Sequence, residues 1–164
     1  MAERIAHPFE PVVTPNSRIL ILGTMPSPKS REQGFYYGHP QNRFWRILMD
    51  LFNEPMKDTI SEKLEFLRTH HIAIWDVFSS CDIKGADDSS IKNAMPNDLD
   101  RIFNIADINA VFTNGQKAST AYKRYFSEKY PVQWICLPST SPANCRSWTY
   151  DTLKEAWQVI LDYL

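Results

Sequence analysis

The segment of residues 34–45, GFYYGHPQNRFW, places three consecutive aromatic residues, 35–37, close to the side-chain amide of Asn42. Aromatic faces stack on flat heteroaromatic ligands, and an amide offers a donor and an acceptor to the edge of a nucleobase. The alternative is that the rings fill the core and Asn42 hydrogen-bonds a loop. The residue types therefore indicate two options, a site for a flat polar ligand or a packed turn.

Four short apolar runs predict the elements that would position this segment. Each run is nearly continuous, which is typical of a strand buried on both faces. The runs are residues 18–23, 72–77, 108–115 and 132–139. Amphipathic helical patterns separate them, and Pro40 is well placed as the first residue of the first long helix. Alternating strands and helices predict an α/β fold, a three-layer α/β/α sandwich, as one domain over residues 1–164 with a core of about residues 18–161.

Polar segments follow all four predicted strands. They are GTMPSPKS, DVFSSCDIKG, TNGQK and PSTSPANCRS. In an open parallel sheet, ligands bind at the carboxyl ends of the strands, so these segments are expected to share one edge. If Pro40 begins a helix, Asn42 lies in its first turn at the same edge. Polar turns are common without any site, but residues 24–38 and 79–96 are longer than turns require and are expected to be functional loops.

Basic residues outnumber acidic ones in two of the segments at this edge. Residues 25–46 contain four basic side chains and one acid, Glu32, and Arg146 follows the fourth strand. A basic lip of this kind attracts phosphates, whereas scattered solvated charge is the equally weighted alternative. The whole chain has a net charge of -1, which excludes a broadly basic binder of nucleic acid.

The sequence lacks the motifs that mark several classes of enzyme and metal-binding protein. The chain contains no GxSxG, GxxxxGK[ST] or GxGxxG motif, its three cysteines form no CxxC pair, and its four histidines are not spaced as metal ligands. No apolar run approaches the roughly 20 residues that span a bilayer. We therefore expect a cytoplasmic protein without metal, cofactor or membrane partner. Asp76, at the end of the second strand, is expected to be either a general base or an acceptor for loop amides.

The motifs GTMPS, GFYYGHPQNRFW, IWDVFSSCDIKGADDSSI, FTNGQKA and LPSTSPAN together resemble the uracil-DNA glycosylase superfamily, and most closely its hypoxanthine-DNA glycosylase branch. The resemblance covers about residues 18–161. It implies a four-stranded parallel central sheet and a monofunctional, monomeric glycosylase that removes a deaminated base from double-stranded DNA, with single-stranded DNA as a further candidate substrate. Uracil, mismatched thymine or xanthine could replace hypoxanthine as the base. A non-catalytic lesion-binding module and a hydrolase of free nucleosides are the alternatives of other classes.

The resemblance also implies roles for individual residues. Asn42 matches the catalytic amide of the HPxN motif, and Tyr37 matches the aromatic residue that stacks on the flipped base. Met25 occupies a position where other branches have a water-positioning asparagine, and Leu137 one where uracil-specific members have histidine. We expect the base to contact Thr24, Met25, Tyr37 and Asn114, with the amide of Asn42 or Asn114 selecting hypoxanthine over adenine. We expect the DNA backbone to contact Ser27, Lys29, Ser139, Thr140, Ser141, Asn144 and Arg146.

Overall fold

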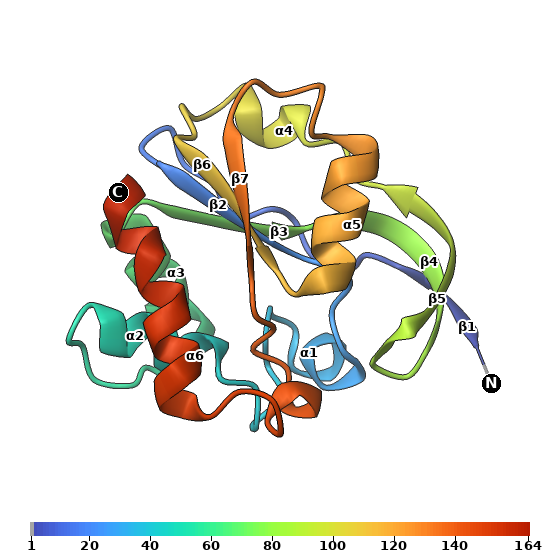
Figure 1. The fold of residues 1–164 in the computed structure, drawn as a ribbon, viewed down its shortest axis with the longest axis horizontal. Helices are drawn as coiled ribbons and strands as arrows, with labels where there is room; N and C mark the ends of the chain where they lie inside the picture. The colour runs from blue at the N-terminus through green and yellow to red at the C-terminus, as the bar shows by residue number, and fades with distance from the viewer. Residues whose placement is uncertain (1) are drawn as a thin grey trace.

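A four-stranded parallel sheet forms the centre of the computed structural model, which describes residues 2–164 (Figure 1). The strands lie in the order β3–β2–β6–β7. Their bounds are β2 Ile19–Gly23, β3 Ile72–Asp76, β6 Ala110–Asn114 and β7 Gln133–Leu137. Every residue of β2, β3 and β6 is buried because helices cover both faces of the sheet. The predicted parallel sheet and its four strands are confirmed.

Within residues 2–164, six α-helices and two 3-10 helices pack around this sheet. They are α1 Pro28–Gln33, α2 Phe44–Leu51, α3 Ile60–Thr69, α4 Asp100–Phe103, α5 Gln116–Tyr125, α6 Tyr150–Trp157, η1 Pro142–Asn144 and η2 Gln158–Tyr163. Figure 1 shows α2, α3 and α6 on one side of the sheet and α5 on the other. This arrangement is the predicted three-layer sandwich.

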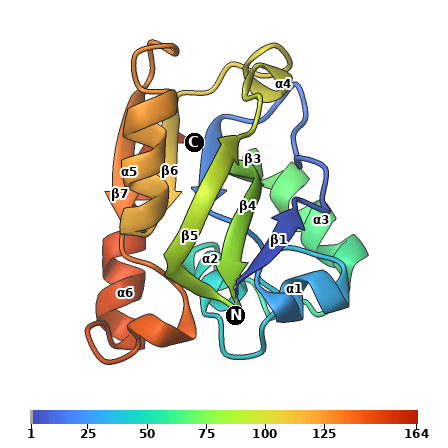
Figure 2. The same cartoon turned by 90° about the vertical axis from the view of Figure 1, so that its right-hand side faces the viewer.

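A second sheet, which the sequence did not predict, lies beside the first (Figure 2). It is antiparallel, in the order β1–β4–β5, with bounds β1 Glu3–Ala6, β4 Phe78–Lys84 and β5 Asp87–Pro96. The expected loop at residues 79–96 is therefore a hairpin that turns at Gly85, where φ is +60°. β5 is mostly exposed, and β4 interrupts its buried apolar residues with polar ones. Both strands therefore lack the continuous apolar runs by which strands buried on both faces are found.

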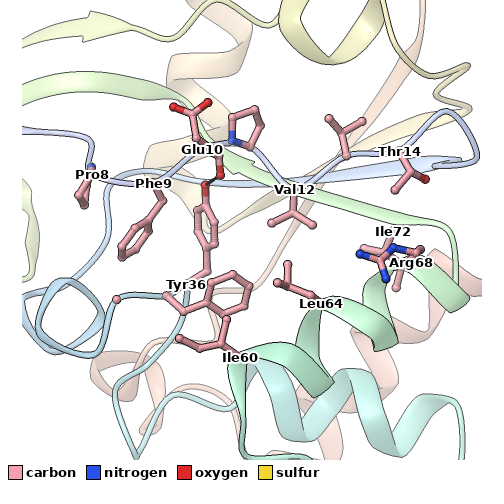
Figure 3. Close-up of a pocket in the computed structure, with 14 residues that line it drawn as sticks. Pro8, Phe9, Glu10, Val12, Thr14, Tyr36, Ile60, Leu64, Arg68 and Ile72 are labelled. Atoms are coloured by element: carbon pink, nitrogen blue, oxygen red, sulfur yellow. Dashed lines mark hydrogen bonds between the residues drawn. The ribbon is translucent and has the colours of Figure 1, made fainter.

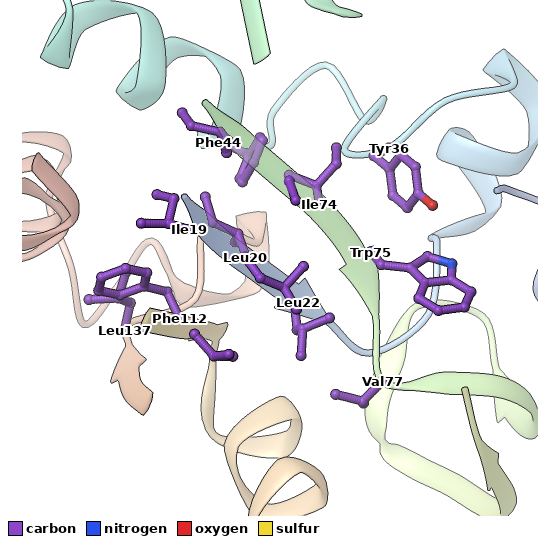
Figure 4. Packing of buried hydrophobic residues seen from close by; sticks show 14 of the residues in the cluster. Ile19, Leu20, Leu22, Tyr36, Phe44, Ile74, Trp75, Val77, Phe112 and Leu137 are labelled. Atoms are coloured by element: carbon purple, nitrogen blue, oxygen red, sulfur yellow. The ribbon is translucent and has the colours of Figure 1, made fainter. Parts of the chain in front are cut away.

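Part of the segment of residues 34–45 packs into the buried core, which holds the segment in place (Figure 4). Phe44 and Trp45 at the start of α2 are almost fully buried, and the indole N–H of Trp45 donates to the carbonyl of Tyr36 at 2.9 Å. Phe35 and Tyr36 are buried as well. Part of the segment therefore fills the core, as the alternative interpretation proposed, and this packing fixes the position of Tyr37 and Asn42.

Candidate active site at the carboxyl edge of the sheet

A cavity of about 600 Å³ opens where the four parallel strands end. Its walls come from the ends of the strands, from residues 36–42, and from the tip of the β4–β5 hairpin. Asn42 and all four predicted base-binding residues, Thr24, Met25, Tyr37 and Asn114, line it. Of the predicted DNA-binding residues, Ser27, Ser139, Thr140, Ser141 and Asn144 line it, whereas Lys29 and Arg146 lie outside.

Asn42 precedes the helix rather than lying in its first turn. The N–H of Asn42 donates to the carbonyl of His39 at 2.9 Å, which closes a turn over residues 39–42 and delays the start of α2 to Phe44. The prediction that Pro40 begins the helix is therefore wrong. The side-chain oxygen of Asn42 accepts a hydrogen bond from the N–H of Phe44 at 2.9 Å. Its NH2 group has no partner among the residues that the structure describes, so this donor and the second lone pair of the oxygen are available to a ligand.

Tyr37 is held as a fixed wall of the cavity. Its φ is +54°, a left-handed conformation that non-glycine residues seldom adopt. The ring stacks on Phe44, with centroids 3.8 Å apart and planes 18° apart. Its hydroxyl is buried and has no hydrogen-bond partner within residues 2–164. Burial, reinforced by the negative charge of Asp76, raises the pKa of this hydroxyl well above its usual range.

A buried histidine–aspartate pair lies beneath Tyr37. Nε2 of His7 donates to Oδ2 of Asp76 at 2.7 Å, and both side chains are about 95% buried. The other oxygen of Asp76 lies so close to Gly23 that a Cβ there would approach it to 2.6 Å and the Tyr37 hydroxyl to 2.9 Å. Gly23 therefore allows the carboxylate and the ring to meet at the floor of the cavity. His7 was not predicted, since it lies outside the expected core of residues 18–161.

Asn114 joins two strand ends at the edge of the cavity. Its side-chain oxygen accepts from the N–H of Thr140 at 3.0 Å, and its NH2 donates to the Thr140 hydroxyl at 3.0 Å. This double contact fastens the loop after β7 to the end of β6. One N–H and one lone pair of the amide remain for a ligand.

Short hydrogen bonds fix the shape of the loop after β7. The Ser139 hydroxyl accepts from the N–H of Ser141, and the Asn144 amide donates to the carbonyl of Ser139 at 3.0 Å. The N–H of Arg43 donates to the carbonyl of Thr140 at 3.1 Å, which ties the loop to the start of α2. The loop is therefore a rigid projection beside the cavity.

The hairpin tip closes the cavity with acidic side chains that were not predicted as site residues. The hydroxyl of Thr24 donates to Oδ1 of Asp88 at 2.9 Å. This contact links the segment after β2 to the start of β5. Asp88 lies in the motif IWDVFSSCDIKGADDSSI, so that motif was the available signal, but the residue is remote from any parallel strand in the sequence.

A second cavity, of about 470 Å³, lies between residues 8–14 and α3 (Figure 3). Phe9, Ile60 and Leu64 give it a mostly apolar lining, and the Tyr36 hydroxyl donates to the carbonyl of Glu10 at 2.7 Å on one side. No asparagine or glutamine lines it, so it lacks the convergent side-chain amides of the first cavity. The first cavity is therefore the better candidate site.

None of the helices within residues 2–164 is long and apolar enough to cross a membrane. No three His, Cys, Asp or Glu side chains in this part of the chain are grouped as ligands of a metal ion.

Comparisons with known proteins give consistent matches over most of the chain. The sequence model of the Uracil DNA glycosylase superfamily matches residues 10–161. A protein of Methanosarcina barkeri (strain Fusaro / DSM 804) named Hypoxanthine DNA glycosylase is 34% identical over 151 residues, covering 91% of this chain and 93% of that protein. A protein of the same name from Methanosarcina acetivorans is 34% identical over 140 residues, covering 84% of this chain and 87% of that protein.

The fold also matches a solved structure. The solution NMR structure of a Methanosarcina acetivorans protein, described as a candidate uracil DNA glycosylase, superposes with a TM-score of 0.78 at 29% identity. The match covers 95% of this chain and 98% of that chain. The similarity thus extends over the cavity and all the strands that form it.

Proposed function

Because this chain belongs to the uracil DNA glycosylase superfamily, we propose that it extrudes deoxyinosine from double-stranded DNA, hydrolyses the bond between hypoxanthine and deoxyribose, and leaves an abasic site. The observation that carries this proposal is the cavity at the carboxyl edge. Its lining brings together an aromatic ring, an incompletely bonded asparagine and a projecting loop, in a chain that is 34% identical to proteins named for hypoxanthine.

Extrusion of the nucleotide exchanges stacking in the duplex for stacking in the cavity. Unstacking and unpairing a base costs a few kcal/mol, and less for a mispaired base such as hypoxanthine. Tyr37, supported from behind by Phe44, offers the flipped base a rigid face. Because the ring is already fixed, little side-chain freedom is lost when the base binds.

Asn42 positions the hydrolytic water in this proposal. Cleavage of an N-glycosidic bond passes through an oxocarbenium-like sugar, which is so electrophilic that the attacking water needs orientation more than a strong base. The Asn42 oxygen keeps one lone pair after accepting from Phe44, and that lone pair can hold the water. The same hydrogen bond to Phe44 keeps the amide from rotating.

Amides account for the selection of hypoxanthine over adenine. Hypoxanthine presents an acceptor at O6 and a donor at N1, whereas adenine presents a donor and an acceptor there. A fixed amide that pairs with hypoxanthine would leave adenine with two mismatched contacts, and buried polar groups without partners are costly. The amides of Asn42 and Asn114 are both placed to make these contacts, since each lines the cavity and keeps free hydrogen-bonding positions.

The loop after β7 contacts the DNA backbone in this proposal. Ser139, Ser141 and Asn144 fix its shape, and their remaining polar groups can bind phosphates next to the extruded nucleotide. Lys29 and Arg146 lie outside the cavity, where they can reach phosphates further along the strand.

Uracil is the second candidate base. The description of the solved Methanosarcina acetivorans structure favours it. Leu137 argues against efficient uracil removal, because uracil-specific members use a histidine at that position to stabilise the departing anion. Hypoxanthine therefore remains the first proposal.

The decisive test uses duplexes with one hypoxanthine or one uracil, and single strands with the same lesions. Each is incubated with the protein in EDTA and then treated with alkali to break abasic sites, with the Asn42→Ala variant as a control for contaminating glycosylases. Breaks at hypoxanthine that the variant does not make would support the proposal. Breaks only at uracil would change the base but keep the class.

Two other results would overturn the enzyme class. Binding of the lesion duplex without strand breaks would indicate a recognition module. Release of base from free deoxyinosine, with none released from DNA, would indicate a nucleoside hydrolase.

A further inference from the structure

Asp88 places a carboxyl group at the mouth of the candidate active site with one oxygen free. Oδ1 accepts from the Thr24 hydroxyl at 2.9 Å, while Oδ2 has no hydrogen-bond partner in the described part of the chain. The β4–β5 hairpin carries this residue to the cavity from the side of the second sheet, where the tip also contributes Ala86 and Ser89 to the lining. The free oxygen is therefore available to a ligand in the cavity.

The surroundings of Asp88 raise the pKa of its carboxyl group above the usual range. The side chain is exposed on one side, yet protein atoms surround much of the carboxyl group. This partial removal from water, helped by the negative charges of Asp76 and Asp87, raises the pKa of Asp88, while the Thr24 hydroxyl and Lys117 of α5 act in the opposite direction. Asp87, its neighbour in the chain, differs: the hydroxyl and N–H of Ser89 donate to its carboxylate and hold the pKa of Asp87 below its usual range. Two adjacent acids whose pKa values shift in opposite directions are a common basis for acid catalysis.

The other titratable side chains of the cavity are poorer proton donors. Burial raises the pKa of Tyr36 and of Tyr37. Asp76 accepts from buried His7 at 2.7 Å. Nδ1 of His39 accepts from the N–H of Gln41 at 3.0 Å and is therefore occupied within the turn.

We propose that Asp88 is the general acid of the reaction and donates its proton to N7 of the hypoxanthine leaving group. This inference rests on the proposed function. As the bond between C1′ and N9 breaks, its electron pair moves into the purine, and the proton from Asp88 Oδ2 joins the lone pair of N7. Hypoxanthine then leaves neutral and Asp88 is left ionised. Water adds to C1′ and releases one proton, which restores the protonated Asp88 through solvent.

The test compares wild type with Asp88→Asn and Asp58→Asn in single-turnover cleavage of a hypoxanthine duplex between pH 5 and 9. Asparagine at position 88 can still accept from Thr24 but has no acidic proton. General acids contribute about 10²–10⁴-fold, and we expect Asp88→Asn to lose a factor of this size. Asp58→Asn removes the same charge from an exposed position outside the cavity and should lose less than about threefold. The wild-type rate should fall as pH rises through the pKa of Asp88, and this fall should be absent in Asp88→Asn.

A second substrate shows whether the rate lost in Asp88→Asn comes from lost proton donation or from a change in charge or packing. A duplex with 7-deazahypoxanthine has a C–H group in place of N7 and cannot accept the proton. Wild type should lose about as much on this substrate as Asp88→Asn loses on hypoxanthine, and Asp88→Asn should lose nothing further, because the two changes remove the same interaction.

Three results would overturn this assignment. Cleavage by Asp88→Asn within threefold of wild type would remove Asp88 from the chemistry while leaving the proposed function intact. Fully additive losses for Asp88→Asn and the deaza substrate would assign Asp88 a role other than N7 protonation. Absence of hypoxanthine release by wild type would overturn the proposed function itself, and the general acid with it.

Discussion

Asn42 illustrates how a single side chain can serve both the fold and the proposed reaction. Its oxygen bonds the first amide of α2, and its other hydrogen-bonding positions face the cavity. Asn42→Ala should abolish cleavage of hypoxanthine, since the water loses its orienting group, and should lower the free energy of unfolding by about 1 kcal/mol through the lost hydrogen bond from the Phe44 N–H. Alkaline cleavage assays and thermal unfolding measure the two effects.

The neighbouring Gln41 provides the matched control for that variant. It is exposed and outside the cavity, so Gln41→Ala should retain both the rate and the stability. Cleavage by Asn42→Ala within tenfold of wild type would exclude Asn42 as the catalytic amide.

Two variants of Tyr37 distinguish the contribution of its aromatic ring from that of its hydroxyl group. Tyr37→Ala removes the stacking face and should reduce turnover by the equivalent of about 1–3 kcal/mol. Tyr37→Phe keeps the face and removes a buried hydroxyl that has no partner within residues 2–164, so it should retain turnover and raise the free energy of unfolding by about 1 kcal/mol. Steady-state kinetics and urea unfolding test both. Equal kinetics for wild type and Tyr37→Ala would show that the ring does not contact the base.

At the scale of elements, β1 and the residues that follow it complete the site from an unexpected direction. His7 donates to Asp76 across 69 positions of sequence, and both groups are buried. His7→Ala would leave a buried carboxylate without its donor, which should cost about 3–5 kcal/mol in the free energy of unfolding.

The variant His7→Gln shows whether the hydrogen-bond donor of His7 matters apart from its imidazole ring. Glutamine supplies a side-chain N–H of similar reach, so His7→Gln should recover much of the stability that His7→Ala loses and much of the cleavage rate. Chemical unfolding and single-turnover kinetics of the two variants test this. Equal stability of His7→Ala and wild type would mean that the pair is dispensable.

The parallel sheet could be predicted because β2, β3 and β6 are buried throughout and their sequences are mostly apolar, as is that of the partly buried edge strand β7. The β4–β5 hairpin could not be predicted in this way, because β5 is mostly exposed and β4 interrupts its buried apolar residues with polar ones. The turn over residues 39–42 also escaped prediction: Pro40 favours a helix start, but the N–H of Asn42 donates to the carbonyl of His39 and α2 begins only at Phe44. Residue preference at Pro40 alone does not distinguish a helix start from a hydrogen-bonded turn.

The candidate site was predictable to the extent that its residues follow parallel strands. Thr24, Asn114 and Thr140 lie where strand ends must converge, and they line one cavity. Asp88 reaches the same cavity through the second sheet, and His7, which follows β1, contacts the cavity residue Asp76, so no rule about parallel strands could have placed them. Both were found only from the three-dimensional arrangement.

At the scale of the whole molecule, a net charge of -1 means that affinity for DNA must come from a few local cations. Several basic residues are occupied within the protein: Arg43 donates to the carbonyl of Trp148 at 2.6 Å, and Arg46 lies 3.8 Å over the ring of Tyr150. Arg146 forms no ion pair with the described residues and follows the projecting loop. We therefore expect Arg146 to contribute more to phosphate binding than either of them.

Salt dependence tests this expectation directly. Each phosphate contact adds about -0.9 to the slope of log K against log salt, so Arg146→Ala should make the slope shallower by about one and weaken binding to lesion and undamaged duplexes alike. Arg18→Ala is the matched control, because Arg18 precedes β2 at the opposite edge of the sheet and should leave the slope unchanged. An unchanged slope for Arg146→Ala would exclude a phosphate contact there. A change confined to lesion DNA would instead indicate that Arg146 acts on the extruded nucleotide.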